Sequence, residues 1–144
     1  MMKMRLLKIS DYQSIYNLWE NTSGMGLRSL DDSEAGIKRF LLRNPKTNFV
    51  AVVDEKIVGV IMAGNDGRRG YIYHLAVQNE YRRRGIASAL VKECLMALRT
   101  EEINKAALVV FSDNKSGNHF WKKLGFIERD DLVYRNLSIN EENI

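Results

Sequence analysis

The sequence predicts an α/β (α+β) fold, with one mixed, twisted sheet of six to seven strands and about four helices on both of its faces. The first observation behind this prediction is that strand-like apolar runs alternate with segments of helical periodicity. The second is the length of 144 residues, which is typical of one domain and sufficient for a hydrophobic core. The third is that no repeat, linker or low-complexity segment divides the chain. We therefore expect a single domain over residues 1–144.

The chain begins with one predicted strand and one predicted helix. Residues 3–9 have the character of a short strand. Ser10 then fits the N-cap of a helix, and Gln13 three residues later completes a capping box. Apolar and aromatic side chains recur at helical spacing as far as about Asn21, so the first helix should end there.

A loop and a second helix should follow. Residues 22–29 are flexible in composition and should form a loop that exposes some apolar side chains. The second helix should begin near Asp31 or Ser33. It should end at Asn44, because Pro45 disfavours helical geometry in the residue that precedes it.

The middle of the chain predicts a three-stranded meander. Residues 49–53 and 57–63 are β-branched, apolar runs joined by a tight polar connection, which indicates a hairpin. Asp66 and Gly67 supply the next turn, and a third strand should cover residues 71–78.

The second half predicts a long helix, a buried strand, a short helix and a return to strand. The long helix has an apolar face that includes Cys94, followed by a buried strand over residues 106–111. A short helix over 115–124 should close at Gly125, and residues 126–137 should form one or two final strands. The passage from residue 71 to residue 111 should be a right-handed parallel crossover. The core face of the long helix consists of Ile86, Leu90, Cys94 and Leu98, with Ala89 and Val91 at its margin.

Composition excludes several functional classes. No apolar run approaches the length of a membrane helix, and the first residues turn polar too soon for a signal peptide, so we expect a cytoplasmic protein without membrane contact. One cysteine and two histidines, scattered along the chain, predict no disulfide and no metal. The net charge of +4 is modest, and the basic residues form no long stripe, so the sequence predicts no nucleic-acid partner. An RNA-binding accessory protein remains the weakest alternative. The protein should be a monomer or a homodimer.

The richest chemistry lies in the turn over residues 82–88, where a strand passes through three arginines into a helix that starts at Gly85. The first amides of a helix lack intrahelical acceptors, and the helix dipole adds positive potential at the same place, so an anion is favoured there. Gly85 permits a sharp turn, and the arginines supply charge-assisted donors. A solvated basic turn before an ordinary helix is the alternative.

This turn resembles the acetyl-coenzyme A signature of the GNAT superfamily of N-acetyltransferases, Arg/Gln-x-x-Gly-x-Gly/Ala, which Arg82, Gly85 and Ala87 match. A second segment resembles the later motif of that family, an asparagine, a small residue, an aromatic pair and a terminal Gly-Phe. The resemblance covers nearly the whole chain and, among subgroups, is greatest to the small bacterial YpeA-type acetyltransferases. It implies the acyl-CoA N-acyltransferase fold. The second motif is carried by Asn114, Gly117, Phe120, Trp121, Lys123, Leu124, Gly125 and Phe126.

The resemblance implies acetyl-coenzyme A as cosubstrate and a set of residues that bind it. In such enzymes two neighbouring strands part, and the pantetheine arm lies in the gap against backbone groups of Leu75, Ala76 and Val77. Asn114 and Gly117 would lie on the other side of the arm, and Phe120, Trp121 and Lys123 would flank the cofactor. The pyrophosphate would be surrounded by Arg82, Arg83, Arg84, Gly85, Ile86, Ala87 and Ser88.

The resemblance also implies direct attack of a primary amine on the thioester in a ternary complex. A backbone amide near Val77 would meet the carbonyl oxygen as it gains charge. Many members carry a tyrosine as the acid where this chain has Trp121, and Tyr73 is the best substitute, because strand alternation places it on the same face as Val77 and opposite His74. Tyr73 with a water chain is also our choice of general base. The other candidates are His74 through water, Glu20 and Asp66.

The acceptor should bind beside the thioester, against the loop over residues 22–32. Asp31, Asp32 and Glu34 would either attract a cationic amine or cap the second helix. The acceptor itself stays open between a small-molecule amine and a peptide or protein amine. The alternative function is a sensor or assembly subunit that binds acetyl-coenzyme A without using it, because Trp121 departs from the family pattern and the glutamate often found on the parted strands is missing.

Overall fold

The computed structural model describes all residues, 1–144. Its centre is one five-stranded sheet with the order β1-β2-β3-β4-β5, antiparallel except for the last pair. The strands are β1 (Met2–Leu6), β2 (Phe49–Val53), β3 (Lys56–Asn65), β4 (Gly70–Val77) and β5 (Ala106–Ala107). The helices are α1 (Tyr12–Glu20), α2 (Glu34–Arg43), α3 (Ile86–Thr100) and α4 (Lys115–Lys123), with short 3₁₀ turns η1 (Ile9–Asp11) and η2 (Asn79–Tyr81).

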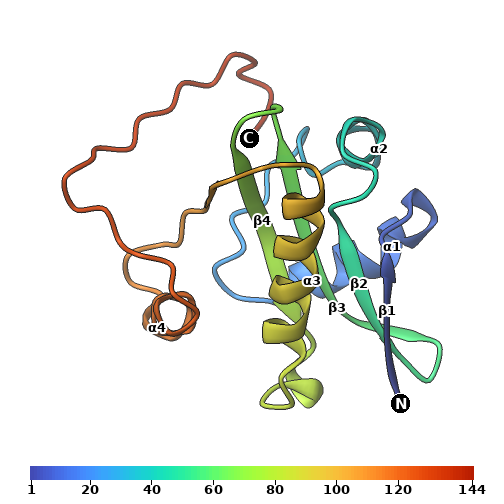
Figure 1. Ribbon diagram of the computed structural model, residues 1–144. Helices are drawn as coiled ribbons and strands as arrows, with labels where there is room; N and C mark the ends of the chain where they lie inside the picture. The colour runs from blue at the N-terminus through green and yellow to red at the C-terminus, as the bar shows by residue number, and fades with distance from the viewer.

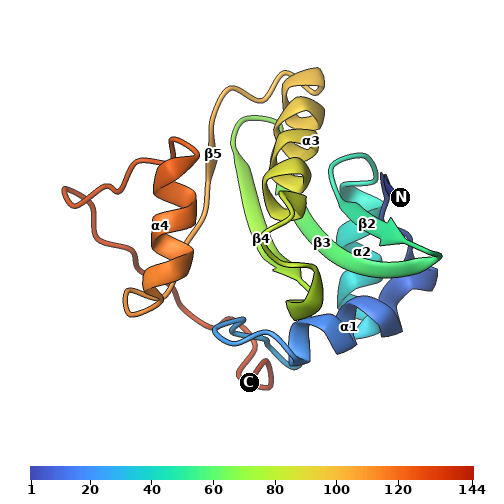
Figure 2. The same ribbon diagram turned by 90° about the horizontal axis from the view of Figure 1, so that it is seen from below.

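The helices cover both faces of the sheet, as predicted. Helix α3 lies across one face, while α1 and α2 lie on the opposite face (Figure 1). Helix α4 stands apart, beyond the β5 edge, and Figure 2 shows the chain from β5 passing between it and β4. None of the helices is both long and apolar enough to span a bilayer.

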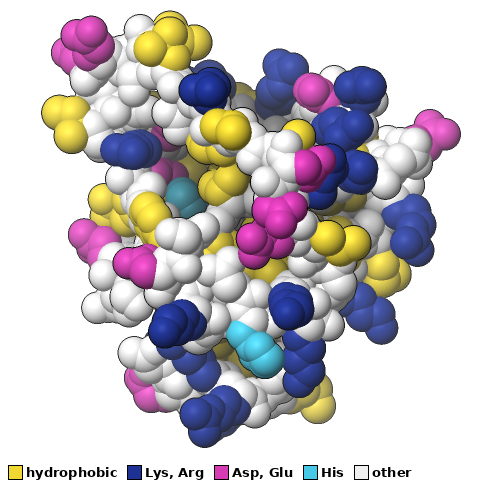
Figure 3. Space-filling model, turned by 90° about the vertical axis from the view of Figure 1, so that its left-hand side faces the viewer, with side chains coloured by type: hydrophobic (Ala, Val, Ile, Leu, Met, Phe, Trp, Pro, Cys, Tyr) yellow, Lys and Arg dark blue, Asp and Glu magenta, His cyan; other side chains and the backbone are white.

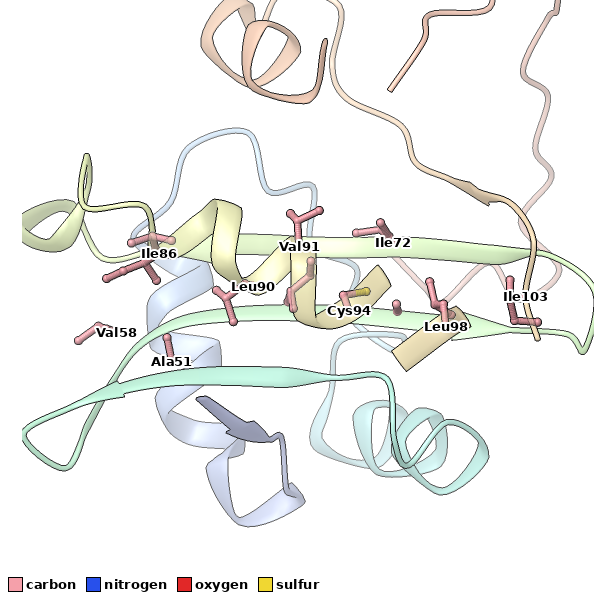
Figure 4. Packing of buried hydrophobic residues seen from close by; sticks show 12 residues of the cluster. Ala51, Val58, Ile72, Ile86, Leu90, Val91, Cys94, Leu98 and Ile103 are labelled. Carbon is pink, nitrogen blue, oxygen red and sulfur yellow. The ribbon is translucent and has the colours of Figure 1, made fainter. Parts of the chain in front are cut away.

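The larger part of the core lies between α3 and the sheet. Ile86, Leu90 and Cys94 project from α3 onto Ala51 of β2 and Ile72 of β4 (Figure 4). The predicted apolar face of the helix is therefore confirmed. Burial raises the pKa of the Cys94 thiol to about 12, so this cysteine remains an uncharged core side chain.

The opposite face buries the aromatic and aliphatic side chains of α1 and α2. Ile15 and Trp19 of α1 and Ile37 of α2 lose almost all contact with solvent against Val50 and Val60 of the sheet. Helix α2 begins where the sequence predicts, because the Ser33 hydroxyl accepts a hydrogen bond from the Gly36 amide at 3.0 Å.

The predicted capping box at the first helix is wrong. Ser10 lies inside the 3₁₀ turn η1, and α1 begins only at Tyr12. The carboxylate of Asp11 accepts the Lys8 amide at 2.9 Å and also receives the Arg5 guanidinium at 2.8 and 3.0 Å. This Arg5–Asp11 contact ties η1 to β1, and Ser10 has no part in it.

The predicted hairpin is present, and its turn is as tight as expected. Val53 pairs with Lys56, so only Asp54 and Glu55 lie between the strands. Both of these residues have a positive φ, 48° and 65°, which is the geometry of a two-residue turn that follows the twist of the strands.

The prediction for the β5 end of the sheet is wrong in its number and length of strands. The sheet has five strands instead of six to seven, the buried strand over 106–111 reduces to Ala106–Ala107, and residues 126–137 form no strand. Because β5 leaves β4 after two residue pairs, it offers no long edge to which residues 126–137 could add. Those residues instead run as an exposed arm, in which Arg129 and Asp131 form a local ion pair at 2.8 Å.

The end of this arm returns to the loop before α2. The carbonyl of Ile144 accepts the Ser29 amide at 2.8 Å. The Asn143 side chain accepts the amides of Leu30 and Asp31 at 3.0 and 3.1 Å and donates to the Asp31 carboxylate at 2.8 Å. We call this set of contacts the tail clasp. It joins residues more than a hundred positions apart.

Candidate active site

Two strands of the sheet separate beside the predicted turn. Strands β4 and β5 pair in parallel only at Gly70 with Ala106 and Tyr71 with Ala107. Beyond these pairs the chain after β5 diverges from β4, and the loop between α1 and α2 approaches it again, with Gly24 next to Asn114 and Gly26 next to Phe111. A hollow of about 710 Å³ lies at this second approach, lined by Ser23, Gly24, Phe111 and residues 113–116.

The turn between β4 and α3 has an unusual backbone. Arg83 has φ +64° and Gly85, the residue before α3, has φ +77°, so two residues of the turn are left-handed. No side chain caps α3, and nothing lies within 4 Å of the place where a Cβ on Gly85 would be. The first backbone hydrogen bond of the helix is donated by Ala89 to Gly85.

Six successive amides of this turn are consequently free. The N–H groups of residues 83–88 donate no hydrogen bond to any other part of the protein. Free amides at a helix start, together with the helix dipole, constitute an anion-binding arrangement. The turn that the sequence predicts is therefore present, and the protein's own groups do not occupy its amides, while the binding of an anion there stays a prediction.

The three arginines of the turn differ in their surroundings. The Nε of Arg82 donates to the carbonyl of Val77 at 3.2 Å, which braces the turn against the end of β4. The guanidinium of Arg84 lies 5.0 Å from the centre of the Tyr81 ring, within range of a cation–π contact. Arg83 forms no side-chain hydrogen bond or ion pair and is exposed to solvent.

The end of β4 directs backbone groups into the gap. The Gln78 amide donates to the Val58 carbonyl of β3 at 2.8 Å. Because successive residues of an antiparallel strand point their backbone groups to opposite sides, Val77 points its amide and carbonyl away from β3. The side chains of Ala76 and Val77 are buried, and Leu75 is half-buried against the α3 side of the core.

A bulge in the middle of β4 overturns the predicted alternation of side chains. Tyr73 pairs with Met62 and Ala76 pairs with Val60, so two residues of β4 stand opposite the single residue between them on β3. His74 has φ +49°, a left-handed conformation that is costly for a residue with a Cβ. The prediction that His74 lies opposite Tyr73 is therefore wrong, and so is the prediction that Tyr73 shares a face with Val77, which packs on the α3 side. The Tyr73 and His74 rings lie 6.3 Å apart, both on the side of α1 and α2.

Tyr73 lies among aromatic rings in this bulge. The centre of its ring lies 4.7 Å from the centre of the Tyr71 ring and 5.7 Å from that of the Phe40 ring. Burial raises the pKa of the Tyr73 phenol, and the nearby Tyr134 of the arm and Asp31 act in the same direction. Burial likewise raises the pKa of Tyr71 to about 12. Because its pKa is raised, the Tyr73 hydroxyl keeps its proton and can donate it. The side chain is 38% exposed, so solvent has access to it.

His74 has a partner that the sequence did not identify. Its Nε2 lies 2.7 Å from Oδ1 of Asp32, and both side chains are largely buried. The other carboxylate oxygen of Asp32 accepts the Arg28 amide at 2.7 Å. Asp32 therefore does not cap α2, which Ser33 does. The pair is 42 residues apart in sequence, and no motif or spacing connects it.

The side chains of α4 form the opposite wall. Asn114 is the N-cap of this helix, where its Oδ1 accepts the Gly117 amide at 3.0 Å. A Cβ on Gly117 would come within 2.6 Å of the Asn114 amide nitrogen, so the cap requires glycine at this position. Trp121 packs against Phe120 and Phe126 with ring centres 5.1 and 5.0 Å away. The Lys123 side chain is exposed and forms no ion pair.

The remaining sequence candidates for a general base lie elsewhere. Glu20 is exposed at the end of α1. The Asp66 carboxylate accepts the amides of Arg69 and Arg68, both at 2.8 Å, and these hydrogen bonds lower the pKa of Asp66. Asp66 thus serves the β3–β4 turn, on the far side of the bulge from the gap.

Comparison with known proteins assigns the family. The model of the acetyltransferase (GNAT) family matches residues 12–126. The chain belongs to the GNAT family. An acetyltransferase of Sodalis glossinidius is 35% identical to this GNAT protein over 132 residues, which cover 92% of each chain.

Solved structures share the fold of this GNAT protein. The PaiA N-acetyltransferase of Thermoplasma acidophilum, in complex with coenzyme A, has a TM-score of 0.76 at 18% identity, covering 87% of this chain and 89% of its own. An acetyltransferase of Clostridium acetobutylicum, solved with acetyl-coenzyme A, has a TM-score of 0.74 at 21% identity, covering 94% and 96%. The expected fold class is therefore confirmed, although the sheet has fewer strands than predicted.

Proposed function

We propose that this GNAT acetyltransferase transfers an acetyl group from acetyl-coenzyme A to a primary amine, by direct attack in a ternary complex. The observation that carries the proposal is the row of six free amides over residues 83–88, at a helix start flanked by three arginines. The fold neighbours described above that hold coenzyme A or acetyl-coenzyme A support it.

The diphosphate would bind at the turn. Free amides from Arg83 to Ser88 would donate to its oxygens, and the exposed Arg83 guanidinium would add charge-assisted donors. Arg82 would act partly through its bond to Val77, which holds the turn in position. No side chain fills the space at Gly85, so the backbone approaches the ligand directly.

The pantetheine arm would lie in the gap between β4 and the chain after β5. The backbone groups of Val77 point into this gap, and those of Leu75 and Ala76 precede them along the strand. On the opposite wall the Asn114 amide nitrogen donates no hydrogen bond within the protein, because only Oδ1 is engaged in the cap. It would donate to the arm, with Phe120, Trp121 and Lys123 alongside.

In the reaction, the amine nitrogen attacks the thioester carbonyl carbon, a carbon–nitrogen bond forms and the carbon–sulfur bond breaks. A backbone amide near Val77 would stabilise the negative charge on the carbonyl oxygen. Tyr73 would give its hydroxyl proton toward the leaving thiolate. Trp121 packs between two phenylalanines, which fits a structural role for this indole.

Calorimetry with three ligands tests the proposed cofactor site. Acetyl-coenzyme A, its 3′-dephospho form and S-acetylpantetheine share the thioester arm, but only the first two carry the diphosphate. We expect S-acetylpantetheine to bind at least about 100-fold more weakly, because it forfeits several hydrogen bonds to charged oxygens. Equal affinity for S-acetylpantetheine and acetyl-coenzyme A would contradict a diphosphate site at the turn.

A thiol-release assay with a panel of primary amines tests the transfer itself. The panel should include polyamines, amino acids, aminoglycosides and peptides with free N-termini. Release of free coenzyme A that depends on the amine, with acetylated product seen by mass spectrometry, is the expected result. Tight binding of acetyl-coenzyme A without transfer to any amine would indicate a sensor or an assembly subunit instead.

A further inference from the structure

The bulge of β4 contains a histidine whose two ring nitrogens lie in different environments. Nε2 of His74 is 2.7 Å from the Asp32 carboxylate, in a contact where the two side chains keep only 15% and 6% of their exposure. Nδ1 forms no hydrogen bond, yet no fully buried side-chain nitrogen or oxygen in the protein lacks a partner, so Nδ1 is not sealed from solvent. Figure 3 shows the side of the molecule that carries α4, where the surface is hollowed between hydrophobic and acidic side chains.

Asp32 is fixed more firmly than a simple ion pair requires. Its second carboxylate oxygen accepts the Arg28 amide at 2.7 Å, and its carbonyl accepts the Tyr12 hydroxyl at 2.7 Å. A carboxylate with both oxygens engaged by donors accepts and does not donate. The neutral imidazole must then carry its proton on Nε2, which leaves the lone pair on Nδ1.

The backbone of His74 is fixed as well. The indole nitrogen of Trp19 donates to the His74 carbonyl at 3.3 Å, and the two rings meet edge to face at 5.0 Å. This contact holds a residue with φ +49°, a conformation that persists only where its surroundings enforce it. Four segments, namely α1, the loop before α2, β3 and β4, thus converge to hold one imidazole.

We infer that His74 is the group that takes the proton from the acceptor amine, and that Asp32 is the residue that positions it. This inference rests on the proposed function. The ammonium group of the acceptor gives one proton to Nδ1 and becomes a neutral amine. The imidazolium that forms is stabilised by Asp32. The amine nitrogen then bonds to the carbonyl carbon, the carbon–sulfur bond breaks, Tyr73 gives its hydroxyl proton to the coenzyme A sulfur, and the second nitrogen proton restores the Tyr73 hydroxyl. His74 returns its proton to solvent after the product leaves.

Tyr73 complements this role and does not compete for it. Its pKa is raised, so it is a poor acceptor of protons at neutral pH, whereas histidine is the side chain that changes protonation nearest to neutrality. The titratable groups that face His74 are Asp32 from the loop before α2 and Tyr73 from β4, while Tyr12 of α1 acts through the Asp32 carbonyl. Trp19 and the residues of β3 opposite the bulge carry no charge.

His74→Gln tests the inference in the amine-dependent assay. Glutamine retains a donor for Asp32 but cannot take a proton. We expect kcat/KM for the best amine of the panel to fall by about 10²–10⁴-fold at neutral pH, with unchanged affinity for acetyl-coenzyme A. The deficit should shrink as the pH approaches the pKa of the amine, where the acceptor is already neutral. His119→Gln, which changes the exposed histidine of α4, is the control and should match the wild type.

Asp32→Asn separates positioning from folding. The amide group of asparagine donates to Nε2, which forces the ring proton to Nδ1 and removes the lone pair that the reaction needs. We expect a loss of activity similar to that of His74→Gln, with a melting temperature close to that of wild type. A purely structural pair would instead lower stability and leave the shape of the pH profile unchanged.

A two-bond ¹H–¹⁵N NMR spectrum of the wild type provides a readout independent of turnover. The neutral His74 ring should be the Nε2–H tautomer, and Asp32→Asn should convert it to the Nδ1–H tautomer. An Nδ1–H tautomer in the wild type, or full activity of His74→Gln at all pH values, overturns the inference alone. A wild type that binds acetyl-coenzyme A and acetylates no amine overturns the proposed function, and the inference with it.

Discussion

Two regions within fifteen residues of each other are proposed to perform different tasks by different means. At the turn over residues 83–88, the backbone would bind the cofactor, and its free amides follow from a local sequence pattern. At the bulge over Tyr73 and His74, side chains would transfer protons, and their positions depend on α1, the loop before α2 and β3. The first region is specified by neighbours in sequence and the second by neighbours in space. Predictions about the turn should therefore concern charge and backbone shape, and those about the bulge should concern distant contacts.

The largest expected effect is at the turn. Gly85→Glu places a carboxylate over the free amides, in space that is empty of protein atoms. We expect the dissociation constant of acetyl-coenzyme A, measured by calorimetry, to rise by about 100-fold, because the carboxylate repels the diphosphate and competes for the same donors.

Gly85→Gln is the matched control, because it has the same size and the same strain at φ +77° without the charge. We expect it to weaken binding by less than about 10-fold. A negative charge at the start of α3 favours the helix, so a loss of stability cannot account for the extra effect of glutamate. If both variants lose affinity equally, charge at this place is irrelevant and the diphosphate lies elsewhere.

The second effect is at the bulge. Tyr73→Phe keeps the aromatic packing against Phe40 and removes only the hydroxyl. We expect kcat to fall by about 10–100-fold, with no change in the affinity for acetyl-coenzyme A. Tyr71→Phe, which alters the adjacent ring 4.7 Å away, should reduce kcat much less. Turnover by Tyr73→Phe that equals the wild type at every pH would remove Tyr73 from the mechanism.

The pH dependence has a definite sign in this comparison. Because the pKa of Tyr73 is raised, the hydroxyl keeps its proton throughout the neutral range and beyond the ordinary titration of tyrosine. The contribution of the hydroxyl to kcat should therefore persist up to about pH 10 and be lost only above it. A difference between wild type and Tyr73→Phe that already vanishes near pH 8 would contradict a raised pKa.

The contrast between features set by neighbours in sequence and features set by neighbours in space also decides how much of the structure the sequence could predict. The meander, the long helix, its buried face and the turn at Gly85 were predicted, because each depends on periodicity or on a local glycine. The bulge at His74 was not predicted. In a strand whose side chains are aromatic or apolar on both faces, an extra residue does not visibly disturb the alternation of polar and apolar positions. Asp32 was assigned to helix capping or to the substrate, because a pair 42 residues apart has no local signature.

The far end of the sheet shows the same limit. Residues 106–111 and 126–137 have the composition of strands, and local propensity predicts them as such. Whether they pair depends on the partner edge, and β5 leaves β4 after two residues. Propensity alone therefore overestimates the number and length of strands at this edge, where the chain leaves the sheet and the gap beside β4 begins.

A smaller effect tests whether the turn depends on one side-chain contact as well as on its backbone. Arg82→Lys keeps the charge but loses the Nε donor to the Val77 carbonyl. We expect the dissociation constant of acetyl-coenzyme A to rise by about 5-fold. Arg83→Lys is the control, because the Arg83 guanidinium forms no hydrogen bond or ion pair within the protein and lysine keeps its charge, so the affinity should change less. An Arg83→Lys effect as large as that of Arg82→Lys would mean that the bond to Val77 contributes nothing.

The smallest effect tests how far the spatial control of the bulge extends. Asn143→Ala removes the side chain of the tail clasp, which holds the amides of Leu30 and Asp31. Asp32, the partner of His74, follows directly in the same loop. We expect the KM for the amine to rise by about 3-fold, because the loop that we expect to line the acceptor side becomes less ordered, while the affinity for acetyl-coenzyme A stays constant. Asn140→Ala is the control, since the Asn140 side chain accepts only the Glu142 amide, within the tail itself. A change in acetyl-coenzyme A affinity and none in the KM for the amine would reverse the comparison, because the distant clasp would then act on the turn and not on the bulge.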